Sequence, residues 1–181
     1  PPLDHAMEKI LPVVDPSGSD SAMLDNALEF LLYSGMDLPK AVMLTIPEPW
    51  SQNRDMPRAI QDMYHYYATM MEPWDGPAAI LFSDGDVVGA CLDRNGLRPI
   101  RYYLTDDGTV ILASEVGVLD LPPEKIVRKS RLGPGKMLLL DTRTGQVRED
   151  EAIKSGYAAT HPYGEWLDRS LVSLRDLPSP N

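Results

Sequence analysis

Leu92-Asp93-Arg94-Asn95-Gly96-Leu97-Arg98-Pro99 separates two strongly apolar runs, and it is the most informative stretch of the sequence. It places three charges, a glycine and a proline where a plain core strand would have none. A lone buried charge is very costly, so these charges must be paired, hydrogen-bonded or exposed. The Asn95-Gly96 pair is typical of a turn with positive φ. The stretch is therefore either a fixed structural corner or part of a site.

The apolar runs around this stretch predict antiparallel hairpins. Asp-Gly between two strand-like runs is a strong hairpin signal, and Thr-Gly is a similar one. The Pro-rich segment around Pro122-Pro123 is expected to be a loop. We expect three hairpins, over residues 78–92, 100–113 and 136–148, which turn at Asp84-Gly85, Asp107-Gly108 and Thr144-Gly145.

The part of the chain before the hairpins is expected to be helical. Apolar residues recur at helical spacing over residues 23–32, with Ser21 as the predicted N-cap and Gly35 as the residue after the helix. A second helix is expected over 38–46. A third starts near Pro57, with Asp55 as its predicted cap and one apolar face up to Met71. Short helices are also expected at 6–11 and 149–157. Helices followed by hairpins predict an α+β fold.

The composition limits the classes of partner. The chain has 181 residues, 17 Lys and Arg against 27 Asp and Glu, and a net charge of −10. This balance argues against nucleic acid or an anionic membrane surface as the main partner. Cys91 is the only cysteine, which excludes a disulfide scaffold and a cysteine-based zinc site and fits a reducing compartment. The start at Pro1-Pro2 without methionine indicates that the natural N-terminus has been removed.

Ser19-Asp20-Ser21 is the first candidate site, because it precedes the first long apolar helix. A carboxylate at a helix N-terminus is stabilised in its charged form by the helix dipole and the free N–H groups. An ionised Asp20 fixed there can bind a substrate ammonium. The simpler interpretation is that these residues only cap the helix, and caps are far commoner than sites.

The other candidates have stronger structural interpretations. Arg94 or Arg98 can form a bidentate pair with Asp93 or with Glu115, and a salt-bridged corner is the favoured reading. Ser114-Glu115 ends an apolar run, but no base accompanies it. Cys91 reads as a small buried hydrophobe within a strand. The three histidines, His5, His65 and His161, show no metal-ligand spacing, and no Gly-rich phosphate loop follows a strand.

Taken together and in order, six segments resemble the glutaminase domain of the glutamate synthase family. The resemblance covers essentially the whole chain, and the combination is specific although no single tripeptide is. The segments are Asp15–Asn26, Ile46–Trp50, Met71–Ala78, Leu92–Pro99, Ala113–Leu119 and His161–Leu167.

The resemblance implies a class II (N-terminal nucleophile) glutamine amidotransferase, whose fold is an αββα sandwich of two antiparallel sheets between helical layers. Such a domain hydrolyses glutamine, and its ammonia passes to a synthase region that converts 2-oxoglutarate to glutamate in nitrogen assimilation. FMN and an iron–sulfur cluster are expected in that other region, with none in this chain. The electron donor is NADPH, NADH or ferredoxin, and the location is cytoplasmic.

The resemblance also assigns residues. Asp20 matches the family aspartate that holds the α-amino group of glutamine, and Ser19 and Ser21 are expected to shape the same pocket. No metal site is expected. The remaining matched positions are expected to be structural or to contact other domains: Asp93, Arg94, Asn95, Gly96, Arg98, Ser114 and Glu115.

The chain departs from the family at the catalytic end. The family's nucleophile is an N-terminal cysteine whose own amine acts as base, and Cys91 does not match it. The family's carboxylate-binding arginine and oxyanion-hole Asn-Gly lie upstream of Asp20. Residues 1–170 are therefore expected to be the C-terminal part of the glutaminase domain, with 171–181 as a linker. We expect the isolated chain to be inactive; the alternatives are a non-catalytic binding module and a fragment that self-associates through open sheet edges.

Overall fold

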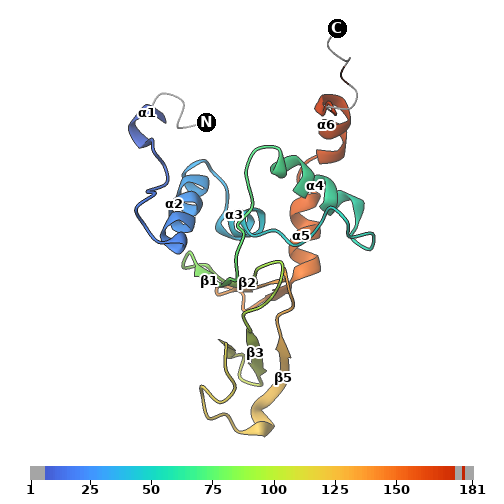
Figure 1. The fold of residues 1–181 in the computed structure, drawn as a ribbon. Coiled ribbons are helices and arrows are strands. Elements are labelled where there is room, and N and C mark those ends of the chain that lie inside the picture. Colours follow the sequence, from blue (N-terminus) through green and yellow to red (C-terminus); the bar gives the residue numbers. More distant parts are fainter. Residues whose placement is uncertain (1–6, 174–176, 178–181) are drawn as a thin grey trace.

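The computed structural model describes residues 7–173 and residue 177, and it has helices on one side of a four-stranded sheet (Figure 1). A three-stranded sheet containing β3 and β5 projects away from the helices (Figure 1). The α+β prediction is confirmed. The helices are α1 (Met7–Ile10), α2 (Asp20–Tyr33), α3 (Leu38–Thr45), α4 (Arg58–Ala68), α5 (Asp150–Ala158) and α6 (Tyr163–Ser170).

Helix starts differ from prediction in two places. The cap of α2 is Ser19, whose backbone is extended and whose hydroxyl accepts the Ala22 N–H at 3.2 Å. Ser21 lies inside the first turn, so its predicted capping role is wrong. Pro57 stands at the N-cap of α4, without a side-chain cap, and Asp55 does not cap it. The end of α2 is as predicted, because Gly35 has φ +96° and donates to the Leu32 carbonyl.

All three predicted hairpins are present, and the strands form two antiparallel sheets. The four-stranded sheet has the order β1-β2-β6-β7, and the smaller one has the order β4-β3-β5. A short 3₁₀ helix, η1 (Pro123–Lys125), precedes β5. The strands are β1 (Ala79–Ser83), β2 (Val87–Leu92), β3 (Arg101–Thr105), β4 (Val110–Ala113), β5 (Ile126–Arg131), β6 (Met137–Asp141) and β7 (Val147–Glu149).

The sequence did not predict β5 or α6. Half of the residues of strand β5 are charged and most are exposed, and its place is set by pairing with β3 from Arg101↔Arg131 to Thr105↔Ile126. Helix α6 begins after Pro162 and buries Tyr163 and Leu167 against the rest of the helical layer. Of the predicted linker, residues 171–173 follow α6 without regular structure, and most of 174–181 lies outside the described residues.

The main core lies between the helices and one face of the four-stranded sheet. Cys91, Met137 and Leu139 supply the sheet side of this core. Alternate residues of β2, Ala90 and Leu92, point to the opposite face and pack with Ile100, where the smaller sheet begins. Strand β2 therefore packs against the helices with one face and against the start of the smaller sheet with the other. None of the described helices combines the length and apolar character needed to span a bilayer.

Candidate functional site

The loop before α2 is held by short-range hydrogen bonds. Asp15 Oδ1 accepts the Ser17 N–H at 2.9 Å and the Ser17 hydroxyl at 2.7 Å, and these bonds lower the pKa of Asp15. The Asp15 N–H donates to Asn26 Oδ1 at 3.1 Å, which fastens the loop to the side of α2. The direction in which the chain enters the helix is therefore fixed, and so is the position of the residues at its N-terminus.

Ser19, Asp20 and Ser21 are all exposed at this N-terminus. Asp20 Oδ1 accepts the Ser21 N–H at 2.8 Å, and the Ser19 and Ser21 hydroxyl oxygens lie 3.1 Å apart. The carboxylate of this exposed residue thus stands at the positive end of a helix of 14 residues. A fixed and exposed carboxylate flanked by hydroxyls has the chemistry to bind an ammonium group.

The Asp93 side chain is buried, and backbone N–H groups satisfy its charge. Its Oδ1 accepts the Ala78 N–H at 3.1 Å, and its Oδ2 accepts the N–H groups of Asn95 at 2.9 Å and Gly96 at 3.3 Å. The Asp93 carbonyl also accepts the Gly135 N–H at 2.9 Å. Such a carboxylate, with three N–H donors, serves to hold a turn rather than to meet a ligand.

The predicted arginine partners in this corner are wrong. Arg94 pairs with Asp75, at 2.6 Å between Nη2 and Oδ1, instead of with Asp93 or Glu115. Gly96 has φ +60°, as the turn prediction required, and a Cβ there would lie 2.7 Å from Pro134 Cγ. The turn is thus packed directly against the loop that leads into β6. Arg98, Ser114 and Glu115 are exposed and have no hydrogen-bond or ion-pair partner among the described residues.

No hydrogen bond or ion pair within the described part of the chain joins Ser19–Ser21 to the Asp93 corner. The two features therefore remain separate, and of the two carboxylates only that of Asp20 is exposed. His65 stacks on Trp50, with ring centroids 5.5 Å apart, so its ring packs against an aromatic neighbour. Among the described residues there is no group of three or more His, Cys, Asp or Glu side chains placed to hold a metal ion.

The sequence interpretation missed an ionic cluster formed by Glu48, Lys136, Asp150 and Lys154. The Lys154 side chain is 2% exposed, and its ammonium group pairs with Glu48 and lies 2.6 Å from Asp150 Oδ1. Lys136 Nζ contacts Glu48 Oε2 at 3.0 Å and Asp150 Oδ2 at 2.9 Å. The cluster joins the loop after α3 to β6 and α5. The one local signal for it is the i, i+4 spacing of Asp150 and Lys154 on a helix.

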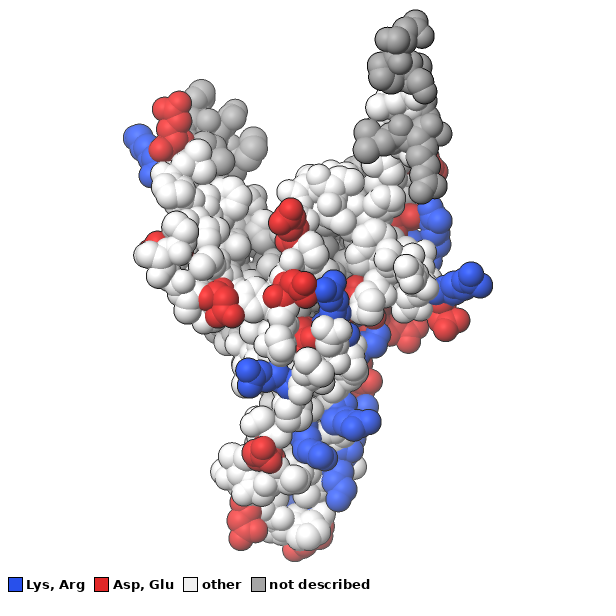
Figure 2. All heavy atoms as spheres, in the orientation of Figure 1, with Lys and Arg blue, Asp and Glu red and all other residues white. Residues whose placement is uncertain are grey.

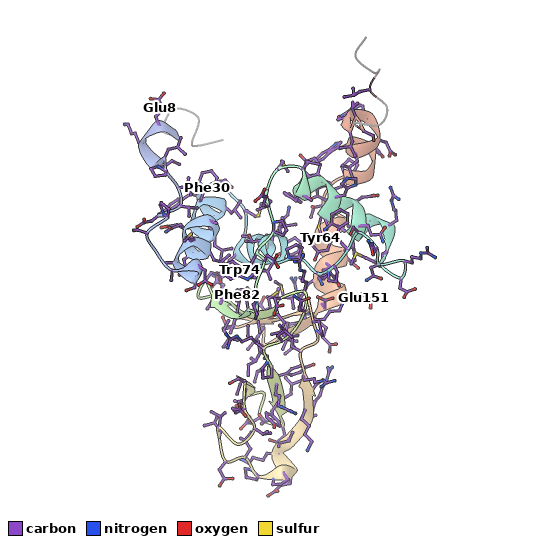
Figure 3. The ribbon with its side chains drawn as sticks, in the orientation of Figure 1. Glu8, Phe30, Tyr64, Trp74, Phe82 and Glu151 are labelled. Carbon is purple, nitrogen blue, oxygen red and sulfur yellow. The ribbon has the colours of Figure 1, made fainter. Side chains whose placement is uncertain are left out.

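The ionisable groups of Tyr64 and Cys91 lie near this cluster, and both have a raised pKa. The Tyr64 hydroxyl is buried without a hydrogen-bond partner among the described residues, and its side chain lies in the helical layer (Figure 3). Burial, followed by the charges of Glu48 and Asp150, raises the pKa of Tyr64 well above its usual value. Burial also raises the pKa of the Cys91 thiol to about 12. Cys91 is therefore protonated at neutral pH and is not a nucleophile.

Comparison with known proteins identifies the family. Residues 2–166 match the family model of class-II glutamine amidotransferases. The chain is 47% identical over 172 residues to the glutamate synthase [NADPH] large chain of Bacillus subtilis, covering 95% of this chain and 11% of that protein.

Relatives from eukaryotes show the same degree of similarity. The chain is 49% identical over 171 residues to the chloroplastic ferredoxin-dependent glutamate synthase of Oryza sativa subsp. japonica, covering 92% of this chain and 10% of the relative. It is 46% identical over 169 residues to the glutamate synthase [NADH] of Schizosaccharomyces pombe, covering 93% of this chain and 8% of that protein. The chain thus spans about a tenth of the length of these relatives. By this match and this identity, the chain belongs to the class II glutamine amidotransferase family.

Proposed function

We propose that this chain forms part of the glutaminase domain of a glutamate synthase and that Asp20 binds the α-amino group of glutamine. The observation that carries the proposal is the exposed Asp20 carboxylate, oriented at the N-terminus of α2 by its bond to the Ser21 N–H at 2.8 Å. Ser19 and Ser21 border the same position and supply hydroxyl groups for the polar end of the substrate. Family membership and similarity to glutamate synthases over more than nine tenths of the chain support this assignment.

In the proposed reaction, glutamine is hydrolysed to glutamate and ammonia. The ammonia is channelled to a synthase site, where 2-oxoglutarate becomes a second glutamate with electrons from a reduced donor. The FMN and the iron–sulfur cluster of such an enzyme belong outside this chain. An iron–sulfur cluster is normally held by four thiolates, and the single buried cysteine of this chain does not fit that ligand set. The same unpaired thiol supports a reducing, cytoplasmic setting.

The chain is proposed to lack glutaminase activity when it is isolated. Its single thiol is that of Cys91, which is buried within β2 and has a pKa of about 12. The nucleophile of the complete domain must therefore come from residues outside those given. The purified chain should release no ammonia from glutamine, and measurable release that survives Cys91→Ala would contradict this part of the proposal.

The role of Asp20 is tested in the full-length protein. Asp20→Ala should raise the KM for glutamine by about tenfold or more, since a hydrogen bond between charged groups contributes roughly 1.5–3 kcal/mol. Activity with added ammonium in place of glutamine should stay unchanged, because the synthase site does not depend on Asp20. Asp25→Ala is the matched control, since Asp25 is an exposed carboxylate one turn further along α2. A normal glutamine KM in Asp20→Ala would overturn the assignment.

The open sheet edges support a further proposal for the isolated chain. In the described part of the structure, β1 and β7 are the edge strands of the larger sheet, and β4 and β5 those of the smaller one. Unpaired edges invite association with another chain. We expect the isolated chain to self-associate, and sedimentation that shows a monomer at all concentrations would exclude it.

A further inference from the structure

A pocket of about 330 Å³ lies where the Leu92–Pro99 turn meets the smaller sheet, and arginines line it. Arg98 comes from the turn, Arg101 from the first position of β3, and Arg131 from the last position of β5. The remaining residues that line the pocket are glycines, prolines and aliphatic residues. Residues that complete it are Gly96, Leu97, Pro99, Ile100, Leu132, Gly133 and Pro134.

Two of the arginines lie directly opposite each other across the strands. Arg101 and Arg131 are register partners, so their side chains leave the same face of the sheet. Tyr102 points to the opposite face, where it is buried. Like charges in this position oppose strand pairing. Such an arrangement is favourable when an anion lies between the two guanidinium groups.

None of the three arginines is neutralised by the protein. Within the described residues, the side chains of Arg98, Arg101 and Arg131 form no ion pair or hydrogen bond, and no Asp or Glu lines the pocket. Other arginines of the same protein do have acidic partners: Arg94 pairs with Asp75, and Arg128 pairs with Glu149. The chain as a whole carries a net charge of −10, so this group of arginines without acidic partners is a local departure from its overall charge. Figure 2 shows Lys and Arg side chains gathered over β3 and β5.

We propose that this three-arginine pocket binds a small oxyanion, either a phosphate group or a dicarboxylate. The planar guanidinium group presents paired N–H donors that match the oxygen atoms of phosphate and carboxylate. Three such groups around one volume suit a ligand with a charge of two or more. The volume is near the lower end for small-molecule sites, which fits a compact anion.

The first test is isothermal titration of the full-length protein with inorganic phosphate and, separately, with malonate. Arg101→Gln and Arg131→Gln should each weaken binding by about tenfold or more, as expected for charge-assisted hydrogen bonds. Arg54→Gln is the matched control, because Arg54 is an exposed arginine without an acidic partner in the described structure, and it should change the Kd by less than about twofold. Dependence on these arginines for phosphate alone assigns a phosphate ligand, and dependence for malonate assigns a carboxylate ligand.

Arg131→Lys separates a shaped pocket from a diffuse positive surface. It keeps the charge but removes the forked donor, so binding should weaken by about fivefold or more. If Arg131→Lys binds the anion as tightly as the unmodified protein does, the proposed oxyanion pocket is wrong. Absence of binding for both anions at millimolar concentration, or binding that persists in Arg101→Gln and Arg131→Gln, would overturn it as well.

A second measurement needs no variant and so does not depend on how the variants fold. Phenylglyoxal modifies exposed guanidinium groups, and mass spectrometry reports the extent at each arginine. Phosphate or malonate should protect Arg98, Arg101 and Arg131 while Arg54 reacts at its usual rate. Equal modification of all four with and without the anion would contradict the proposal.

Discussion

Lys154 and Glu48 form an ion pair inside the protein, and their side chains are only 2% and 6% exposed. The Lys154 ammonium also lies 2.6 Å from Asp150 Oδ1 and donates to the Gly135 carbonyl at 2.9 Å, so all three of its N–H donors have partners. The pair connects α5 with the loop that follows α3. This buried contact therefore adds to the packing that joins the C-terminal helices to the N-terminal ones.

Removal of one partner of this pair should be strongly destabilising. Lys154→Met leaves the Glu48 carboxylate buried with only Lys136 to neutralise it, and we expect a loss of about 3–5 kcal/mol in the free energy of unfolding. Urea denaturation measures this loss. Arg143→Ala is the control, because it breaks an ion pair with Asp86 that is exposed on both sides and should cost less than about 1 kcal/mol.

Replacing both partners tests whether the penalty comes from the unpaired charge. The double variant Glu48→Leu with Lys154→Met should recover at least half of the loss, since Lys136 and Asp150 still pair at 2.9 Å. A double variant less stable than either single variant would show that the pair itself supplies the stability.

Gly135 should be the least replaceable glycine of the turns. Its φ is +64°, and an added Cβ would lie 2.5 Å from Glu48 Cβ and 2.9 Å from Glu48 Cα. Gly145 has a similar φ of +71° but open space around it. Gly145→Ala should cost about 1–2 kcal/mol for the backbone conformation, and Gly135→Ala about 1–3 kcal/mol more for the overlap. Equal losses in thermal unfolding would show that the Glu48 backbone yields without cost.

The two serines beside Asp20 should differ in their effect on stability. Ser19→Ala removes the N-cap of α2 and should lower the unfolding free energy by about 1 kcal/mol. Ser21→Ala removes a hydroxyl that contacts only Ser19 Oγ, and we expect a loss below about 0.5 kcal/mol. Chemical denaturation of the two variants distinguishes them. A larger loss for Ser21→Ala would make Ser21 the effective cap.

Cys91 should make stability fall at alkaline pH. Burial raises the pKa of the thiol from 9.0 to about 12, so above pH 9 the unfolded chain loses the proton while the native protein keeps it. Unfolding then releases protons, and this group lowers the free energy of unfolding by up to about 1.4 kcal/mol per pH unit. Urea midpoints between pH 8 and 10.5 should decline less steeply for Cys91→Ala. Urea midpoints that fall equally steeply with pH in both proteins would contradict the raised pKa of Cys91.

The sequence predicted the elements whose signals are local. Gly85, Gly108 and Gly145 all have positive φ at the turns of the three predicted hairpins. The missed strand β5 has an unfavourable local pattern, because Arg128 and Lys129 occupy positions where apolar residues are usual. Its strand conformation comes from hydrogen bonds to β3, and those involve residues distant in sequence.

The candidate site was predictable in position but not in detail. The order of Ser19, Asp20 and Ser21 indicated a helix start, yet either serine satisfies the capping pattern, and only the backbone angles identify Ser19. The pairing of Glu48 with Lys154 joins residues far apart in the chain, and no spacing rule relates them. Similarly, the partner of Arg94 proved to be Asp75, because the chain before β1 passes beside the turn.

The bond from the Gly135 N–H to the Asp93 carbonyl has a consequence for how the protein can change. β2 and β6 are neighbours in the larger sheet, and this bond continues their ladder just beyond Leu92 and Lys136. The whole smaller sheet is therefore an excursion that leaves and returns at adjacent points. Its length can therefore vary at the end far from β2, while Ile100 must stay packed on Ala90 and Leu92 of the larger sheet. The helices and the larger sheet thus form one structural unit, and the smaller sheet is inserted into it between β2 and β6.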